Sequence, residues 1–304
     1  MLPHYYSLNE YLLNTFGSKM YKLALNARMT CPNRDGLIDT RGCIFCSAGG
    51  SGDFAGNAPT VTEQIEAGIS QVSDKYHGDD YIAYFQAYTN TYAPVEYLRN
   101  VYMEAALNSH IRIISIATRP DCLDDGICRL LADINSIKPV WIELGLQTTN
   151  CNSVRYIRRG YKNECFADAI MRLRHCHSCE HIIAHMIIGL PGETTADMLA
   201  TASYISRYAD GIKLQLLHIL KGTDLADDYA AQHFHLPELD EYIDILEEII
   251  KRLPPDMVVH RLTGDGPKKL LIAPMWSADK KHVLNTMNQR FMNDCLIQGS
   301  LYRK

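Results

Sequence analysis

Short apolar runs alternate with longer amphipathic stretches along most of the chain, and this alternation limits the fold more than any other feature of the sequence. Apolar runs of strand length predict buried parallel strands, and the amphipathic stretches between them predict helices that cover a sheet. Strands are expected at 21–27, 81–86, 111–117, 140–145, 182–188 and 211–217, and the run at 257–262 could add one more. Helices are expected at 61–76, 95–108, 124–134, 166–175, 196–208, 224–232, 239–252 and 279–296.

Six strand–helix units are too few for a closed barrel of eight. A partial (β/α)6 TIM-like barrel that is open on one side fits this number, and a doubly wound α/β sheet fits it as well. In both folds the functional residues lie at the C-terminal ends of the strands. We expect an N-terminal helical extension over residues 1–20, the barrel over 21–220, and a C-terminal helical extension over 221–304 that closes the barrel.

Composition narrows the class of protein. The net charge of −5 argues against indiscriminate binding of nucleic acid, although it leaves room for a local basic patch. No apolar run has the length of a membrane span, and the first ten residues do not resemble a signal peptide, so we expect a cytoplasmic protein without a membrane partner. Ten cysteines in such a protein predict metal binding or redox chemistry where they cluster, rather than a disulfide framework.

Three cysteines cluster directly after the first expected strand. Cys31, Cys43 and Cys46 are separated by eleven and two residues. An iron–sulfur cubane normally has four thiolate ligands, so three would leave one iron open to a small molecule. The alternative is a zinc site, which needs a fourth ligand; no histidine lies between Cys31 and His77, and a more distant one would have to complete it.

Seven short strings extend this motif over nearly the whole chain. They are TCPNRDG from residue 30, YFQAYTNTYAP from 84, TRPDCL from 118, ELGLQT from 143, GLPGET from 189, LLHILKGT from 216 and HRLTGDGP from 260. In this order they resemble the YtqA/YhcC-like family of the radical S-adenosylmethionine (SAM) superfamily, which is related to the radical domain of the Elongator catalytic subunit. The resemblance implies a partial barrel of the radical SAM type. It also implies a [4Fe–4S] cluster on Cys31, Cys43 and Cys46, SAM on the open iron, and an external electron donor of the flavodoxin or ferredoxin type.

Polar residues at the strand ends are the candidates for binding SAM. Many superfamily members carry Gly-Gly-Glu after the second strand, whereas this chain has Gln86, Thr89 and Asn90, which could also form a turn that caps the next helix. Arg119 could pair with the SAM carboxylate or belong to an ordinary loop. By resemblance, the cofactor-binding residues are Phe45, Gln86, Thr89, Asn90, Thr118, Arg119, Glu143, Gln147 and Gly189.

The late strands carry the candidates for substrate binding. Lys213 shares one face of its strand with Gln215, and a lysine within an apolar strand is expected to meet a carboxylate inside the barrel. The segment that contains Thr263 and Asp265 is expected to close the open side of the barrel. The substrate-binding residues that we predict are Tyr88, Arg158, Arg159, Lys213, His218, Lys221, His260 and Arg261.

A basic segment at 155–162 suggests the substrate. Its four cations and two tyrosines could hold a phosphate backbone and a loop base, and Arg172, Arg174, Lys268, Lys269, Lys280 and Lys281 could extend it. With the Elongator resemblance, this favours tRNA as partner and the C5 substituent of a wobble uridine as target. The other readings are a solvated helix face, a radical enzyme that acts on a small metabolite or a protein, and a non-enzymatic zinc or iron–sulfur module.

A second group of metal-ligand types occurs at residues 175–181, where Cys176 and Cys179 are flanked by three histidines. It lies between an expected helix and the fifth strand, at the end of the barrel opposite the expected site. We interpret it as a solvated turn in preference to a second metal site.

Overall fold

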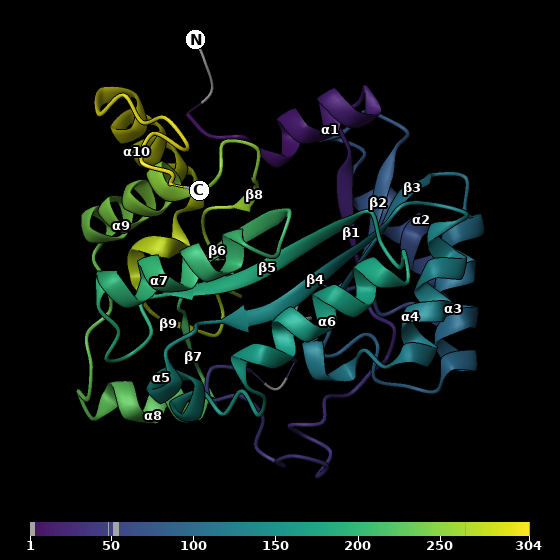
Figure 1. The fold of residues 1–304 in the computed structure, drawn as a ribbon, viewed down its shortest axis with the longest axis horizontal. Helices are drawn as coiled ribbons and strands as arrows, with labels where there is room; N and C mark the ends of the chain where they lie inside the picture. The colour runs from purple at the N-terminus through teal and green to yellow at the C-terminus, as the bar shows by residue number, and fades with distance from the viewer. Residues whose placement is uncertain (1–3, 48, 51–54, 265, 304) are drawn as a thin grey trace.

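A parallel sheet of seven strands forms the centre of the molecule (Figure 1). The computed structural model describes residues 4–47, 49–50, 55–264 and 266–303. The sheet has the order β1-β2-β3-β4-β5-β6-β8, and every neighbouring pair is parallel. Its strands are β1 (Tyr21–Leu25), β2 (Tyr81–Phe85), β3 (Ile111–Thr118), β4 (Val140–Gln147), β5 (His181–Ile188), β6 (Gly211–Leu216) and β8 (Val258–Arg261).

The sheet is curled into part of a barrel. Lys22 of β1 and Lys213 of β6 both contact the carboxylate of Glu143 on β4, although two strands lie between β1 and β4 and one lies between β4 and β6. A flat sheet would hold side chains from β1 and β6 far apart, because neighbouring strands lie almost 5 Å from one another. We call the concave space the lumen.

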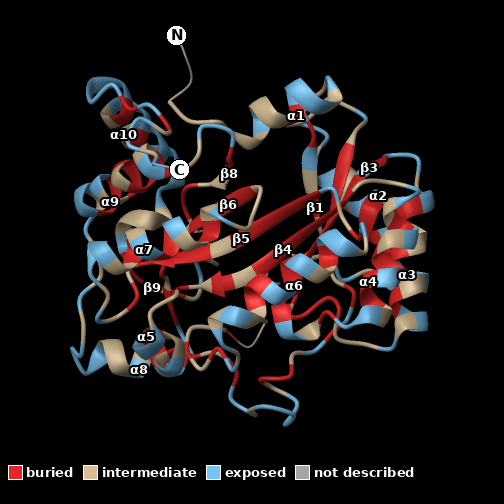
Figure 2. Cartoon of the chain, viewed as in Figure 1, coloured by how far each residue is buried: buried red, intermediate tan, exposed pale blue. Residues whose placement is uncertain are grey.

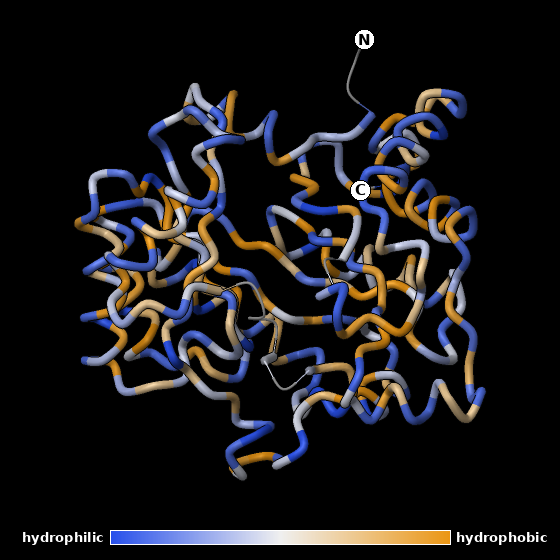
Figure 3. Tube along the Cα trace, turned by 180° about the vertical axis from the view of Figure 1, so that it is seen from behind, coloured by the Kyte–Doolittle hydropathy of each residue, from blue (hydrophilic) through white to orange (hydrophobic). Residues whose placement is uncertain are grey.

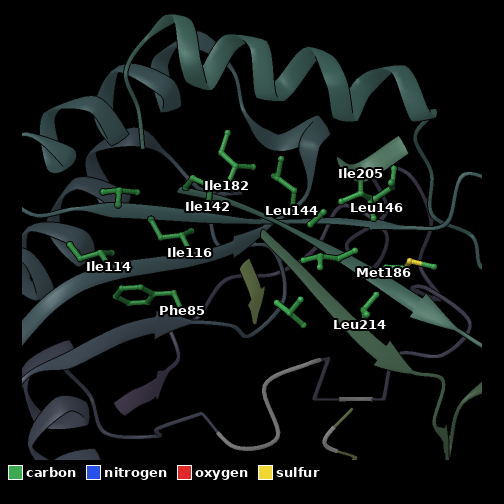
Figure 4. Packing of buried hydrophobic residues seen from close by; sticks show 14 of the residues in the cluster. Phe85, Ile114, Ile116, Ile142, Leu144, Leu146, Ile182, Met186, Ile205 and Leu214 are labelled. Atoms are coloured by element: carbon green, nitrogen blue, oxygen red, sulfur yellow. The ribbon is translucent and has the colours of Figure 1, made fainter. Parts of the chain in front are cut away.

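Helices cover the convex face of the sheet. Those that follow the strands are α2 (Val61–Val72), α3 (Val95–Leu107), α4 (Asp125–Asn135), α6 (Asn163–His175), α7 (Thr195–Ser206) and α9 (Leu239–Arg252). Strand residues of one parity point into this layer, as Ile142, Leu144 and Leu146 do toward the helices in Figure 4. Burial is therefore concentrated in the strands and on the inner faces of the helices (Figure 2). None of the described helices is long and apolar enough to cross a membrane.

The N-terminal ends of the strands are closed by α1 (Leu8–Phe16). Leu12 of this helix is fully buried against lumen-facing apolar residues that include Ile82, Ile113 and Trp141. The segment before α1 is held by the C-terminal part of the chain: the Tyr6 amide donates to Gln298 Oε1 at 2.8 Å. Helix α1 therefore covers apolar lumen residues at this end of the strands.

The remaining elements lie around the C-terminal ends of the strands. A two-stranded antiparallel ribbon of β7 (Ile219–Leu220) and β9 (Leu271–Ala273) crosses near the end of β6. Hydrophilic stretches dominate the loops at the outside of the trace, seen from behind in Figure 3. The other helices are α5 (Cys151–Tyr156), α8 (Asp224–Ala230), α10 (Lys280–Asn293) and the short 3-10 turns η1 (Pro120–Cys122) and η2 (Met275–Ala278).

The predicted fold class is confirmed, with one addition. All six expected strands are present, and the apolar run at 257–262 contains β8, which pairs with β6 and becomes the seventh strand. The sequence prediction missed α5 and the β7–β9 ribbon because both are short. The three-part division of the chain stays a prediction, since β8 comes from the expected C-terminal extension and yet lies in the main sheet.

Candidate functional site

A cavity of about 1290 Å³ opens at the C-terminal ends of the strands and continues into the lumen. Side chains from β1 to β8 line it together with the segment of the three clustered cysteines. Pockets for a single small ligand usually have volumes of roughly 300–1,000 Å³, so this cavity has room for a cofactor and part of a substrate. In barrels of this kind, the C-terminal ends of the strands are where chemistry takes place.

Cys31, Cys43 and Cys46 all line this cavity. Their segment is organised by its own hydrogen bonds: the Arg34 amide donates to the Cys31 carbonyl at 2.7 Å, and the Cys46 amide donates to the Cys43 carbonyl at 3.0 Å. Asn33, which is fully buried, donates from Nδ2 to Cys43 Sγ at 3.4 Å. The segment therefore holds three sulfur atoms toward one space without a disulfide between them.

The surroundings favour the thiolate form of one of these cysteines, Cys43. A hydrogen bond from Cys46, together with the charges of Arg119 and Arg158, lowers the pKa of Cys43 to about 6, while the same hydrogen bond raises the pKa of Cys46. Three soft sulfur donors in a cationic setting are the donor set of a [4Fe–4S] cluster with one open iron. Among the residues that the structure describes, no three His, Cys, Asp or Glu are grouped to hold a single metal ion. This finding covers the three cysteines as well, so the choice of a cluster over zinc rests on the resemblance to the superfamily and not on this observation.

The loops after β2 and β3 bring four of the predicted cofactor residues to the cavity. Gln86, Thr89, Thr118 and Arg119 line it. The guanidinium of Arg119 already donates to both carboxylate oxygens of Asp121, at 2.9 and 2.7 Å, so two of its N–H groups are used within its own loop. These residues are placed to surround a ligand of the cluster, and their individual roles stay predictions.

The role of Asn90 in cofactor binding stays a prediction: the structure uses its amide donors on the backbone, while its Oδ1 is buried without a hydrogen-bond partner among the described residues. Its side chain is fully buried, does not line the cavity, and donates to the carbonyl oxygens of Phe85 and Ala117 at 3.2 and 2.9 Å. Both donors of the amide therefore tie the end of β2 to that of β3. An Asn in a polar loop suggests a ligand contact from sequence, whereas here it satisfies backbone groups that the strand ends leave open.

Glu143 is the centre of a buried polar cluster in the lumen, and the prediction that it binds the cofactor is corrected. The carboxylate has no exposed surface. Oε1 accepts from Lys22 Nζ at 2.9 Å and Ser115 Oγ at 2.8 Å, and Oε2 accepts from His185 Nε2 at 2.7 Å and from Lys213 Nζ. Four donors use its four lone-pair directions, so none remains for a ribose or an ammonium group.

The charge states of this cluster follow from its contacts. Burial and the nearby charge of Lys213 lower the pKa of His185 to about 4, so the imidazole is neutral and donates from Nε2. Burial would raise the pKa of Glu143, but Lys213 and Lys22 hold it well below its usual value. Burial lowers the pKa of Lys213, although its contact with the Glu143 carboxylate favours the ammonium form. The expected partner of Lys213 inside the barrel is thus confirmed as Glu143.

Gln147 lines the cavity, and a glycine before it makes its position possible. A Cβ atom on Gly145 would lie 2.5 Å from Gln147 Nε2, so residue 145 has to lack a side chain for Gln147 to point into the lumen. Tyr161 closes over this place: its hydroxyl donates to the Gly145 carbonyl, and its ring packs under the guanidinium of Arg119 at 4.9 Å.

The remaining candidates divide into two groups. Phe45, Tyr88, His218, His260 and Arg261 line the cavity, so they stay candidates for contact with a ligand. Lys221 is exposed and Gly189 has a φ of 88° beside Pro237; neither lines the cavity, and both assignments stay predictions. Asp265 lies outside the described residues.

Two of the four cations of the predicted basic patch at 155–162 are engaged by the protein itself, whereas Arg155 and Lys162 are exposed. Arg159 is only 2% exposed, and it donates to the carbonyl oxygens of Leu146 and Thr148 at 2.7 and 2.8 Å. Arg158 is paired with Asp224 at 2.6 Å. Both arginines therefore fasten the loop after β4, which corrects their assignment to substrate. A run of cations in sequence does not reveal that carbonyl groups at a strand end will bind them.

The cationic surface lies elsewhere in the cavity. Among the described residues that line it, nine are lysine or arginine and one, Glu143, is a carboxylate. Lys268 and Lys269 are exposed beside the β7–β9 ribbon, and Lys280 begins α10; we call these three the rim lysines. The other six cations are Lys22, Arg34, Arg119, Arg159, Lys213 and Arg261. This sign of charge is opposite to that of the chain as a whole.

The histidine and cysteine segment at 175–181 lies at the other end of the barrel, as expected. Arg174 nearby is paired with Asp210 at 2.8 Å and does not extend the cationic surface. His181 begins β5, and its Nε2 lies 2.9 Å from Nε2 of His260. The interpretation of this segment as a turn stays a prediction.

Family models match both halves of the chain. The model of the radical SAM superfamily matches residues 40–205, and that of the radical SAM C-terminal domain matches residues 209–293. The chain is 40% identical to the uncharacterized protein YtqA of Bacillus subtilis, over 99% of this chain and 93% of that one. It is 34% identical to the protein YhcC of Escherichia coli K12, over 95% and 92%.

Two further similarities are more distant. The chain is 22% identical to a tRNA-2-methylthio-N(6)-dimethylallyladenosine synthase of Nitratiruptor, over 66% of this chain and 46% of that one. The fold is similar to that of Elp3 from the archaeon Methanocaldococcus infernus, with a TM-score of 0.68 and 16% identity over 92% of this chain and 64% of the archaeal one.

Proposed function

Because this chain belongs to the radical SAM superfamily, we propose that it uses a SAM-derived radical to modify an anionic macromolecule, tRNA. Proteins of this superfamily are enzymes that bind a [4Fe–4S] cluster and SAM. When bound, this pair supplies reductive cleavage of the sulfonium and a 5′-deoxyadenosyl radical that removes a hydrogen atom from the substrate. We assign the cluster to Cys31, Cys43 and Cys46, which fit it in type, number and placement.

The protein residues position the cofactors and exclude water. Asn33 donates to Cys43 Sγ, and Arg34 donates from Nη2 to the carbonyl oxygens of Cys46 and Ser47 at 3.0 and 2.6 Å, so the cysteine segment is rigid before any group binds. Helix α1 closes the far end of the lumen. A closed lumen protects a reactive radical from solvent and from side reactions.

The charge of the cavity supports tRNA as the substrate. Nine cations and one carboxylate among the described lining residues make this the place on the molecule that attracts a polyanion, in spite of the net charge of −5. The rim lysines are placed to contact phosphates outside the lumen, and an unstacked base would enter it. The distant similarity to a tRNA-modifying enzyme agrees with this choice. We retain the C5 substituent of a wobble uridine as the proposed target.

The radical chemistry is tested by anaerobic purification and cluster reconstitution, followed by incubation with dithionite and SAM and an assay of 5′-deoxyadenosine. We expect a brown protein that produces 5′-deoxyadenosine. A matched pair of variants tests the ligands: Cys43→Ala abolishes cleavage, whereas Cys165→Ala, outside the cavity, retains it. Cleavage by the Cys43→Ala variant would refute the assignment.

The substrate is tested with tRNA from cells that lack this protein, by binding and by mass spectrometry of nucleosides after turnover. Replacing Lys268 and Lys269 by Glu is expected to weaken tRNA binding by about tenfold or more and to flatten its salt dependence. Lys138 and Lys251 lie outside the cavity, and the same replacement there serves as the control. Unchanged affinity of the first variant would contradict tRNA and favour a small anionic metabolite.

A further inference from the structure

The polar cluster around Glu143 contains more positive than negative charge. Two ammonium groups, of Lys22 and Lys213, share the one carboxylate of Glu143. His185 adds no charge because it accepts at Nδ1, 3.5 Å from Gln215 Nε2, and donates from Nε2 to Glu143. Among the described residues, no second acidic side chain is paired with either lysine. A positive charge inside a protein is costly unless an anion accompanies it.

The donors of this cluster exceed its acceptors as well. Both oxygens of Glu143 are fully engaged by four donors. Lys22 has three N–H groups and, to the residues that the structure describes, one hydrogen bond, to Glu143; its ammonium group also faces the rings of Tyr84 and Trp141 at 4.9 and 5.9 Å. Its side chain keeps 22% of its exposure and lines the cavity. Donors therefore point into a space that a ligand can reach.

We propose that Lys22, supported by the Glu143–Lys213 pair, forms the floor of the substrate pocket and binds an oxyanion, a carboxylate or a phosphate, carried by the group that enters the lumen. This inference rests on the proposed function, because it describes which part of the substrate the lumen holds. The rim lysines lie at the open side of the cavity and contact backbone phosphates. The oxyanion on the floor is therefore a separate one, attached to the base or to its substituent.

The two lysines have different roles in this site. Lys213, with a side chain only 4% exposed, neutralises Glu143 from within the wall of the lumen. Lys22 comes from the edge strand β1 and is the more accessible of the two. Removing Lys22 thus takes away the excess charge and leaves the Glu143–Lys213 pair in place.

The test measures binding of inorganic phosphate and of malonate to the cluster-loaded protein without SAM, as a rise in melting temperature at constant ionic strength. The starting protein carries Lys268→Ala and Lys269→Ala, which removes exposed cations of the rim. We expect Lys22→Met to weaken anion binding about 10- to 100-fold, the range of a charge-assisted hydrogen bond, and Lys22→Arg to retain it within a few-fold. Lys75→Met, on the exposed outside, is the control and leaves the affinity unchanged.

Each outcome decides the inference. Stabilisation that Lys22→Met abolishes supports the floor site, and a preference for malonate or for phosphate identifies a carboxylate or a phosphate as the natural group. Equal stabilisation of Lys22→Met and its parent overturns the inference. If Lys22→Met does not fold, crystals of the unaltered protein soaked in selenate decide: an anomalous peak within hydrogen-bond distance of Lys22 Nζ supports the site, and its absence overturns it. Binding of tRNA is measured in a separate experiment. If tRNA does not bind, the anion-binding experiment still tests the site at Lys22.

Discussion

Removing the Glu143 carboxylate is expected to destabilise the protein strongly. In a Glu143→Leu variant, Lys22, Ser115, His185 and Lys213 lose their common acceptor. Deleting one partner of a buried ion pair raises the free energy of the folded state by about 3–5 kcal/mol. A buried lysine that loses its counter-ion can escape this cost by releasing its proton. At pH 7 this release costs about 5 kcal/mol for a lysine with the ordinary pKa of about 10.4, so the destabilisation cannot greatly exceed that value.

A second variant separates lost charge balance from lost packing. Glu143→Leu combined with Lys213→Met removes both members of the most buried pair and leaves Lys22, which is 22% exposed and can reach water. We therefore expect the double variant to be more stable than Glu143→Leu alone by about 1–4 kcal/mol. Asp133→Leu removes a largely exposed carboxylate, 59% accessible and paired with Arg99, and should change stability by less than about 1 kcal/mol.

The assay is guanidinium unfolding under anaerobic conditions, followed by circular dichroism and with equal cluster content in all variants. The midpoint and slope give the change in unfolding free energy for each. Additive effects of the two substitutions, or a Glu143→Leu variant as stable as Asp133→Leu, would refute the description of Glu143 as the counter-ion that the lumen requires.

Three further predictions follow from other parts of the site. Replacing Arg159 by Met leaves carbonyl groups of the loop after β4 without donors and should destabilise the fold by about 2–4 kcal/mol. An Arg159→Lys variant with the original melting temperature would show that the several donors of the planar guanidinium are not required. Because His185 titrates near 4 in the fold and near 6.5 when unfolded, stability should fall by up to about 3 kcal/mol as the pH drops from 6.5 to 4, and urea titrations of His185→Gln should show a shallower decline. Asn90→Ala should lower the melting temperature in the cluster-free protein, where a purely cofactor-binding side chain would leave it unchanged.

The fold was predictable from the sequence because its signals are local and repeated. Each strand is an apolar run, each helix an amphipathic stretch, and sequential strands in such a pattern lie side by side. The seventh strand was harder to predict, since Val258–Arg261 has only four residues and its apolar character is split by His260 and Arg261. Its identity depends on pairing with β6, which no local pattern contains.

The site was predictable where the residue type alone decides the chemistry. Three cysteines close together after a strand predict a metal or iron–sulfur site, and the structure places all three on one cavity. Arginine and asparagine are different, because each serves equally well for a ligand or for an open backbone carbonyl. Arg159 and Asn90 bind carbonyl groups here, and only tertiary structure shows it. Lys22 was missed for the opposite reason: it is a lone cation in an edge strand, and its partner Glu143 is distant in sequence.

The clasp between the two ends of the chain has a consequence for synthesis on the ribosome. The Tyr6 amide is bonded to Gln298, whose Nε2 donates in turn to the Pro254 and Met257 carbonyl oxygens at 2.6 and 2.8 Å. The segment before α1 therefore cannot be held in this way until the residues around Gln298 have been made and have folded. A nascent chain that stalls early leaves the apolar underside of the sheet uncovered, and quality-control proteases recognise such surfaces.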